Sequence, residues 1–576
     1  MSADASVAAL CDAFWEWRLK ESPEFAAYCG VHDCDDLWDD TSENAVKQTN
    51  LAVKRFMSQA DDIKSDLCSK EEQQNLLLLK DTLKVYLDGS EFRCFLLPVS
   101  FLEGVHDLND TFSFLVFNSQ EDFQKYVAKL RRLPQKIAQV EAVLGQSIEE
   151  KFTNHQRSMN AVPGQISSLL DTKADESLFL KPFHEASATI DPKVISSLKD
   201  EAINLVNSQI YPAYRKLKEM IENQYMKNLR QAEGVSSLAN GAQLYQKCLD
   251  YHLSCHMTPA EIHELGQKEV KRIHESMLKI AEEEGFTGEN AAAKFKELLS
   301  SDKFHFKSAD EVLNYVKHIS MNLIRPKLPS IIKNIPDLQL IIQPVPPSRA
   351  TSPAAFYMSG TYDGSRPGVY YVNANKLESC HKYEFMALSL HEGEPGHHTQ
   401  TMYCQTHSKT PAFRQYLEDQ KYYLAPSKFP AYTAHIEGWG LYSEALGEEL
   451  GLYEDRYSLF GRYSFEMLRA ARLVVDTGLH AMGWSWQDAV KYLVDYTMSD
   501  TWTMTNEIDR YITWPGQACA YKIGELKIWD LRHQAEKKLG DNFDVREFHE
   551  AVIGSGSIPL SLLETKVDEY IQDNTK

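Results

Sequence analysis

The amino-acid sequence predicts a large, mainly α-helical fold, and three observations lead to this prediction. The 576 residues are 43% hydrophobic and 25% charged, a balance that allows a chain to bury a large core. From Ala5 to about Leu328, apolar residues recur at three- and four-residue spacing and strand-like alternation is scarce. After Glu378 the same helical spacing returns. We therefore expect many helices in two subdomains, residues 1–330 and residues 331–576.

The clearest helix start in the first half lies at Thr258. Its hydroxyl can cap a helix whose first turn contains Pro259, and Glu261 can reach back to complete a capping box. The following helix should end at Gly285, because glycine is the usual residue just beyond a helix C-terminus.

A proline-rich segment from Arg325 to Pro353 interrupts the helical pattern. The apolar run Leu338–Gln343 within it predicts a short strand. A second β-rich run, Gly368–Val372, follows a turn signal at Asp363–Gly368. The two runs could pair into a small β-ribbon. Helices are then expected in the following segments: Lys382–Glu392, Thr433–Leu450, Tyr463–Met482, Trp486–Met498 and Ala518–Leu539.

The composition of the chain indicates which partners it can bind and where in the cell we expect it. The 61 basic and 82 acidic residues leave a net charge of −21, which disfavours nucleic acid and anionic membrane surfaces as partners. The ten cysteines include no Cys-x-x-Cys pair and are expected to be reduced thiols. Residues 1–21 contain no uninterrupted apolar segment. We expect a cytoplasmic protein.

A group of histidines and carboxylates suggests a Zn²⁺ site. His391 is followed by Glu392 and then by His397 and His398; imidazoles bind zinc, and a neighbouring carboxylate can act as a general base toward water. The second histidine of a His-Glu-x-x-His motif comes four residues after the first, whereas these come six and seven later.

The unusual spacing has a structural interpretation. Glu394-Pro395-Gly396 should break the helix, and an outward bulge would return His397 to the ligand position. In an unbroken helix His398 would share the face of His391 but lie roughly 10 Å along the axis. The break favours His397, and His398 stays open as the alternative.

Two acids on a later helix complete the candidate site. Glu437 and Glu444 are seven residues apart and therefore lie on one helical face. Glu437 is the candidate third ligand, and Glu444 is a candidate partner that orients a ligating imidazole. The alternative is that both are solvated carboxylates.

Further along the chain, Asp476 and His480 are one helical turn apart. They could form an oriented catalytic imidazole beside the site or a buried structural pair. Arg472, on the same face as Asp476, could hold that carboxylate or a terminus of the substrate.

These motifs resemble those of the DUF885 family of zinc metallopeptidase-like proteins. The resemblance extends over nearly the whole chain and rests on Pro395-Gly-His-His-x-Gln400, on the Glu437–Glu444 segment, on Arg472–His480 and on Pro515–Gly524. More distantly, the arrangement is similar to the clan of thimet oligopeptidase and angiotensin-converting enzyme. That similarity implies Glu437 as a ligand and a deep central cleft. The β-ribbon directly precedes the histidines in the sequence, and we expect it beside the metal site. The inserted Pro395-Gly396 departs from the clan pattern.

The same resemblance suggests roles around the substrate. Tyr521 lies in a segment similar to the one that supplies an oxyanion-stabilising phenol in thimet-type enzymes. Lys522 or Arg366 could pair with the C-terminal carboxylate of a peptide. Tyr371, in an aromatic cluster, could line the substrate channel or belong to the core.

The sequence thus favours zinc-dependent hydrolysis of short peptides with Glu392 as general base. The alternatives are a metal-dependent hydrolase of a non-peptide small molecule and a non-catalytic peptide-binding protein.

Overall fold

A computed structural model of the chain describes residues 2–187, 190–288, 291–335, 339–346, 354–361, 366–406, 410–417, 420–497 and 499–575. Three features expected from the sequence fall partly outside these residues. They are the start of the first strand at Leu338, the turn residues 363–365 and the helix end at Met498.

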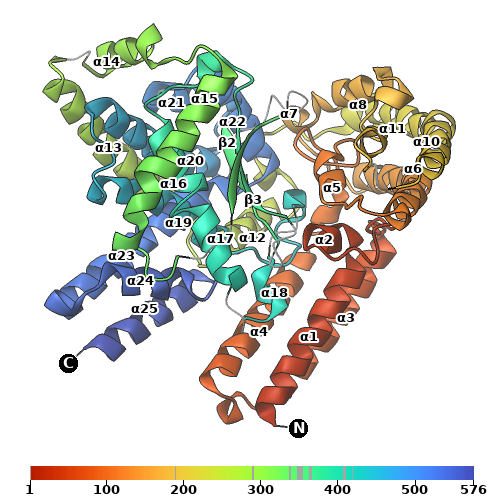
Figure 1. Cartoon of the computed structure of the whole chain (residues 1–576), viewed down its shortest axis with the longest axis horizontal. Helices are drawn as coiled ribbons and strands as arrows, with labels where there is room; N and C mark the ends of the chain where they lie inside the picture. Colours follow the sequence, from red (N-terminus) through yellow and green to blue (C-terminus); the bar gives the residue numbers. More distant parts are fainter. Residues whose placement is uncertain are drawn as a thin grey trace. The chain divides into compact units, whose positions relative to one another are not determined.

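The chain forms two compact units. Unit 1 comprises residues 1–247, 411–430 and 512–514, and unit 2 comprises residues 248–410, 431–511 and 515–576. The main helices of unit 1 are α1 (Ala3–Glu21), α3 (Glu43–Asp61), α4 (Lys70–Ser90), α6 (Gln120–Glu149), α8 (Val162–Asp171), α10 (Pro192–Leu205) and α11 (Tyr211–Asn223). Helices α1, α3 and α4 pack side by side in this unit (Figure 1).

Unit 2 is built mainly from helices around a small sheet. Its helices include α13 (Pro259–Glu283), α15 (Ala309–His318), α16 (Phe385–Glu392), α17 (His397–Thr406), α19 (Thr433–Glu449), α20 (Arg456–Ala481), α21 (Trp486–Tyr496), α22 (Thr501–Thr513), α23 (Ala520–Leu539), α24 (Val545–Ile553) and α25 (Leu560–Asn574). The mainly α-helical fold predicted from the sequence is confirmed. No helix in the described part of the chain combines the length and apolar character needed to cross a bilayer.

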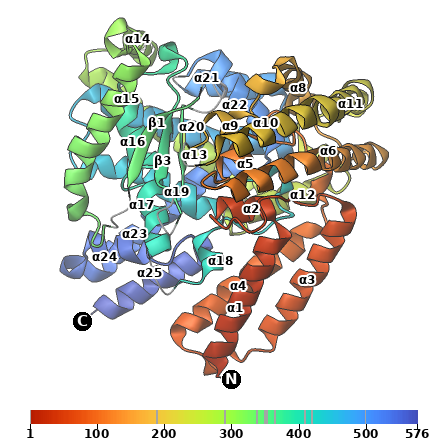
Figure 2. The ribbon, with the colours of Figure 1, turned by 45° about the vertical axis from the view of Figure 1, so that its right-hand side comes forward.

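The small sheet contains one strand more than the sequence predicted. Its strands are β1 (Leu340–Pro344), β2 (Ala355–Met358) and β3 (Gly368–Val372), in the order β1-β3-β2. β3 pairs in parallel with β1, with Leu340 opposite Gly368, and antiparallel with β2. The sheet lies beside α16, to which β2 packs (Figure 2).

Helix α13 shows why the subdomain boundary placed at residue 330 differs from the boundary between the units. This helix begins with the predicted capping box, in which Thr258 accepts from the backbone of Glu261 and Glu261 bonds back to Thr258. It then packs along α20, where a Cβ at Gly266 would lie 2.7 Å from the Cβ of Leu473. This close packing between helices distant in sequence assigns α13 to unit 2.

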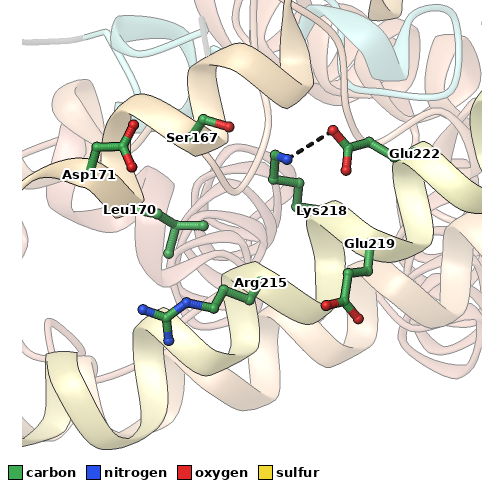
Figure 3. A pocket seen from close by; sticks show the side chains of 7 residues that line it. All are labelled: Ser167, Leu170, Asp171, Arg215, Lys218, Glu219 and Glu222. Atoms are coloured by element: carbon green, nitrogen blue, oxygen red, sulfur yellow. Dashed lines mark ion pairs between the residues drawn. The ribbon is translucent and has the colours of Figure 1, made fainter.

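Unit 1 has a surface pocket between α8 and α11 (Figure 3). Its lining carries charges of both signs, and Lys218 pairs with Glu222 at 2.8 Å. The residues that line it are Ser167, Leu170, Asp171, Arg215, Lys218, Glu219 and Glu222. None of the candidate site residues predicted from the sequence lines this pocket.

Candidate metal centre

The candidate site starts with a short turn between α16 and α17. Helix α16 ends at Glu392, and α17 begins at His397, so the expected break separates the two histidines into different helices. At Gly396 an added Cβ would lie 1.9 Å from the carbonyl oxygen of His391, so the turn has room only for glycine. The turn brings the rings of His391 and His397 to a centroid separation of 4.7 Å.

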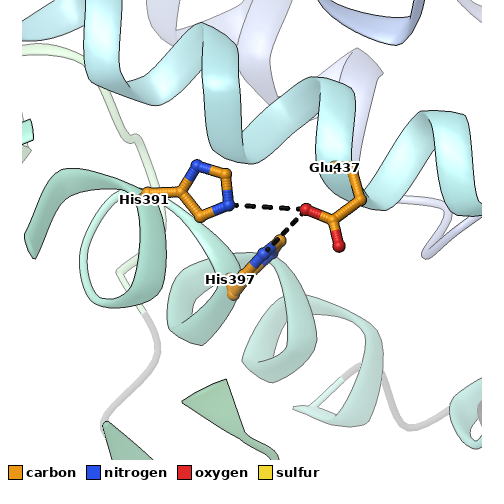
Figure 4. Close-up of side chains that lie close together, drawn as sticks. All are labelled: His391, His397 and Glu437. Carbon is orange, nitrogen blue, oxygen red and sulfur yellow. Dashed lines mark ion pairs between the residues drawn. The ribbon is translucent and has the colours of Figure 1, made fainter. Parts of the chain in front are cut away.

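Three side chains from three helices converge at this turn. Nε2 of His391 and Nε2 of His397 each lie 3.4 Å from Oε2 of Glu437 on α19 (Figure 4). For ligand bonds of about 2.0–2.1 Å at tetrahedral angles, zinc ligands lie about 3.4 Å apart. The donor set of two imidazoles and one carboxylate, and the spacing of its atoms, therefore fit a zinc ion.

His398 takes a different position. Its Nδ1 lies 3.1 Å from the hydroxyl of Tyr357 on β2, and its ring lies against Gly368, where a Cβ would be 2.8 Å from the same nitrogen. The structure therefore joins His397 to His391 and Glu437, and directs His398 toward the sheet.

Helix α19 also fixes the orientation of His391. Oε1 of Glu444, which is 1% exposed, lies 2.8 Å from Nδ1 of His391, so that Nε2 faces Glu437. The ring packs directly on the helix at Gly440, where a Cβ would lie 2.7 Å from Cε1 of His391. Glu437, Gly440 and Glu444 share one face of α19, as their spacing of three and four residues requires.

The charges of the site influence one another. Burial would raise the pKa of Glu437, but His391 and His397 hold it well below its usual value. Burial would lower the pKa of His391, but Glu437 and Glu444 raise it to about 9. Burial raises the pKa of Glu392 despite the opposing charges of His391 and His397.

Tyr521 reaches the site through a close crossing of α19 and α23. A Cβ on Gly438 would lie 2.4 Å from the backbone of Gly524, so the two helices approach without intervening side chains. Tyr521 precedes Gly524 by almost one turn and lies within electrostatic reach of Glu437. Burial and this carboxylate raise the pKa of Tyr521, which keeps its hydroxyl a proton donor.

Lys522, a predicted partner for a peptide carboxylate, lies in the interior with its ammonium group surrounded by carboxylates of the protein. Its side chain is 0% exposed, and its Nζ lies 2.6 Å from Glu466, 2.5 Å from Glu525 and 3.1 Å from Glu269. One residue corresponds to about 100° around a helix, so Lys522 points away from the direction that Tyr521 takes. It is the centre of a buried ion network that links α13, α20 and α23.

Asp476 and His480 both lie in the interior of unit 2, and a catalytic role for them stays a prediction. Both side chains are fully buried. Asp476 accepts a hydrogen bond from the backbone of Gly516 at 3.1 Å, and Nε2 of His480 lies 3.0 Å from the carbonyl oxygen of Tyr511. The two residues thus stabilise the backbone between α22 and α23. Arg472, considered for either Asp476 or a substrate terminus, donates to Tyr511 and Glu507.

Two further residues of the predicted substrate site lie on or beside the sheet. The Arg366 guanidinium donates to the carbonyl of Ser359 at 3.4 Å. Tyr371, in β3, stacks on Phe356 of β2 with centroids 4.9 Å apart. Their roles in substrate binding stay predictions.

Sequence reasoning missed two arginines near the site. Nη2 of Arg469 lies 3.6 Å from Oε1 of Glu444, and its guanidinium lies 5.9 Å from the ring centre of Tyr521. Its spacing of three residues from Arg472 places both on one face of α20, a signal that was present in the sequence. Arg510 reaches the same region from α22, and only the tertiary packing reveals it.

Comparisons with known proteins agree on the fold. A family model described as "Bacterial protein of unknown function (DUF885)" matches residues 23–567. The solved structure of "the putative lipoprotein from Colwellia psychrerythraea" is 24% identical over 100% of both chains, with a TM-score of 0.91. That of "a putative lipoprotein of unknown function from Shewanella oneidensis" is 17% identical over 97% of this chain and 99% of that chain, with a TM-score of 0.71. No curated protein matches this chain.

At these identities the two solved structures show the shared fold. Both proteins are described as "putative lipoprotein", and this finding contradicts the cytoplasmic location expected from the sequence. That expectation rested on the absence of a recognisable signal in residues 1–21, and we withdraw it. The family match spans most of the chain, including every residue of the candidate metal centre. The chain therefore belongs to the DUF885 family.

Proposed function

We propose that this protein is a zinc-dependent hydrolase that cleaves amide bonds in short peptides. The observation that carries the proposal is the position of Oε2 of Glu437, 3.4 Å from Nε2 of both His391 and His397. This is the spacing of ligands around a tetrahedral zinc ion, about 3.4 Å. The resemblance to zinc metallopeptidases, and more distantly to the thimet oligopeptidase clan, supports the same function.

In this proposal, His391 and His397 hold the metal through their Nε2 atoms and Glu437 through its carboxylate. Three protein ligands are typical of catalytic zinc sites, because the fourth position stays open for water or substrate. Zinc bound there supplies a Lewis acid that polarises a carbonyl group and lowers the pKa of water. Glu444 keeps His391 in the orientation that presents Nε2.

The proton transfers are assigned to Glu392. This residue follows His391 directly, and burial raises the pKa of its carboxyl. Its carboxylate accepts a proton from the attacking water and then gives that proton to the nitrogen of the leaving amine. The Tyr521 hydroxyl donates a hydrogen bond to the substrate oxygen on which negative charge develops.

The sheet favours an extended peptide as the substrate. Among the described strands, β2 is bonded only to β3 and so lies at a sheet edge. An extended peptide can bind to such an edge through backbone hydrogen bonds. Tyr357 on β2 touches His398, which directly follows the ligand His397, so this edge leads to the candidate metal centre.

The proposal is tested by measuring metal content and hydrolysis on the same preparations. We expect about one zinc per chain by elemental analysis, and cleavage of a peptide library, detected by mass spectrometry, that stops with chelator and returns with zinc. The variants His391→Ala and Glu437→Ala should lose the metal. Full zinc occupancy in both variants would show that the site lies elsewhere. Zinc binding without cleavage of any peptide would refute the peptidase function while leaving the metal site intact.

A further inference from the structure

Two arginines, the buried Arg472 and the largely buried Arg510, lie near Tyr521, and each has a guanidinium nitrogen without a hydrogen-bond partner among the described residues. Arg472 is 6% exposed, donates to Tyr511 at 2.7 Å and to Glu507 at 2.9 Å, and its buried Nη1 has no hydrogen-bond partner in the described part of the chain. Arg510 donates to Glu507 and to Gln517, each at 2.9 Å, and its buried Nε likewise has no partner among the described residues.

The arginine pair carries more positive charge than its protein partners balance. Both guanidinium groups contact the same oxygen of Glu507, Oε2, which also accepts from the hydroxyl of Tyr511. Burial would raise the pKa of Glu507, but Arg510 and Arg472 hold it well below its usual value, so it is an anion. Among the described residues, Glu507 is the one carboxylate that either guanidinium contacts, so these direct contacts leave an excess of one positive charge. Burying such a charge without a counter-ion is costly, which favours an anionic ligand.

Tyr521 connects this pair to the candidate metal centre. The Arg472 guanidinium lies 4.5 Å above the ring of Tyr521, and Gln517, which binds Arg510, also donates to the Tyr521 hydroxyl at 3.4 Å. The charges of Glu437, Arg472 and Arg510 all act on the pKa of Tyr521. The excess positive charge is therefore close to the residues assigned to hydrolysis.

We propose that Arg472 and Arg510 bind a carboxylate of the substrate, so that the protein acts on peptides carrying a carboxylate close to the bond that is cleaved. The inference rests on the proposed function and names its substrate class. Guanidinium groups bind carboxylates through charge-assisted hydrogen bonds. Nη1 of Arg472 and Nε of Arg510 are the donors that have no hydrogen-bond partner among the described residues and could bind the substrate carboxylate. The carboxylate can be the C-terminus of a peptide or an Asp or Glu side chain.

The first experiment compares matched ligands that differ only in this charge. Acetyl-trialanine as the free acid and as its C-terminal amide are titrated into the metal-free full-length protein by calorimetry. Acetyl-Ala-Glu-Ala amide and acetyl-Ala-Gln-Ala amide distinguish a side-chain carboxylate from a terminal one. In at least one pair we expect the acid to bind at least about tenfold more tightly than the amide. This is the gain in affinity expected from one charge-assisted hydrogen bond. With zinc-loaded protein, kcat/KM should show the same preference.

The second experiment assigns the preference to the two arginines. In Arg510→Gln and Arg472→Gln the acid and amide ligands should bind within about twofold of each other, and Arg510→Lys should recover part of the preference. Arg462→Gln is the matched control. Arg462 is a buried arginine of α20 that pairs with Glu466 at 2.7 Å in the separate network around Lys522, so its replacement should leave the acid preference unchanged.

Several results would overturn the proposal. If acid and amide bind equally in both pairs, the carboxylate subsite is excluded. The same conclusion follows if none of the four peptides binds measurably. Equal loss of activity on acid and amide in the arginine variants would mean that the arginines only support Tyr521. Absence of zinc and of all hydrolysis would refute the proposed function, but the binding comparison on metal-free protein would still decide whether the subsite exists.

Discussion

Replacing Gly440 by alanine tests the proposed metal centre without changing any of the proposed ligands. The added Cβ would lie 2.7 Å from Cε1 and 2.8 Å from Nε2 of His391. Carbon atoms in contact are about 3.5–4.0 Å apart, so the ring must move by at least about 0.8 Å. Metal sites tolerate displacements of about 0.2 Å in ligand distance. The displacement is therefore several times the tolerance, and we expect zinc affinity to fall by at least about 100-fold.

The matched control is Gly447→Ala, on the same face of the same helix. Its Cβ would lie 2.6 Å from Leu390 Cδ1 and 2.6 Å from Tyr453 Cε2, so it crowds the core to a similar degree without touching His391. Overpacking of this kind costs about 1–3 kcal/mol of stability. Zinc affinity, measured by competition with a chromogenic chelator, should stay within about threefold of the wild-type value.

Thermal unfolding followed by circular dichroism establishes that both variants are folded before their zinc affinities are compared. Wild-type zinc affinity in folded Gly440→Ala would refute the position of His391 against α19. If Gly447→Ala loses zinc to the same extent, the cause is general crowding between α16 and α19, and the argument from the His391 ring fails.

Three other predictions follow from the structure. Glu392→Gln should retain zinc and fold while turnover falls by about 100-fold or more, as measured by peptide hydrolysis and elemental analysis; near-normal turnover would place the base elsewhere. His397→Ala should lose zinc, whereas His398→Ala should retain it, and the opposite pattern of metal contents would reverse their assignment. Burial raises the pKa of Glu103 from 4.5 to about 7, against the opposing hydrogen bond from Trp514. Because the folded state holds this proton more tightly than the unfolded state, the stabilisation is complete below pH 4.5 and is lost as the pH rises to about 7. As the pH rises across that interval, the free energy of unfolding of Glu103→Gln, measured in urea, should increase by about 1–3 kcal/mol relative to that of the wild type. A difference between the two free energies that does not change with pH would contradict the raised pKa of Glu103.

The sequence could predict those features that depend on neighbouring residues. The start of α13 follows from the hydrogen-bonding capacity of Thr258 and Glu261, and the end of α16 from Pro395 and Gly396. The seven-residue spacing of Glu437 and Glu444 places both carboxylates on one face of α19. Local rules of this kind brought His391, either His397 or His398, and the two acids into one hypothesis, in which the resemblance to the thimet clan favoured Glu437 as a ligand.

Features that depend on tertiary packing were not predictable in the same way. Lys522 and Tyr521 are adjacent in sequence, yet one lies in a buried ion network and the other reaches toward Glu437. That difference is set by the rotation of α23 against α19, which follows from the contact of Gly438 with Gly524. The burial of His480 likewise depends on α22, from a distant part of the sequence. The deep central cleft stays a prediction.

The turn at Gly396 has a consequence for recognising related sites. His391 and His397 belong to different helices. The number of residues between them is therefore set by the length of the turn that joins the helices and not by the repeat of a single helix. A pattern written for two histidines four residues apart on one helix does not match this arrangement. A template made of two Nε2 atoms, each 3.4 Å from one shared carboxylate oxygen, would recognise it whatever the intervening sequence. Metal centres with interrupted helices are better catalogued by such atomic constellations than by strings of letters.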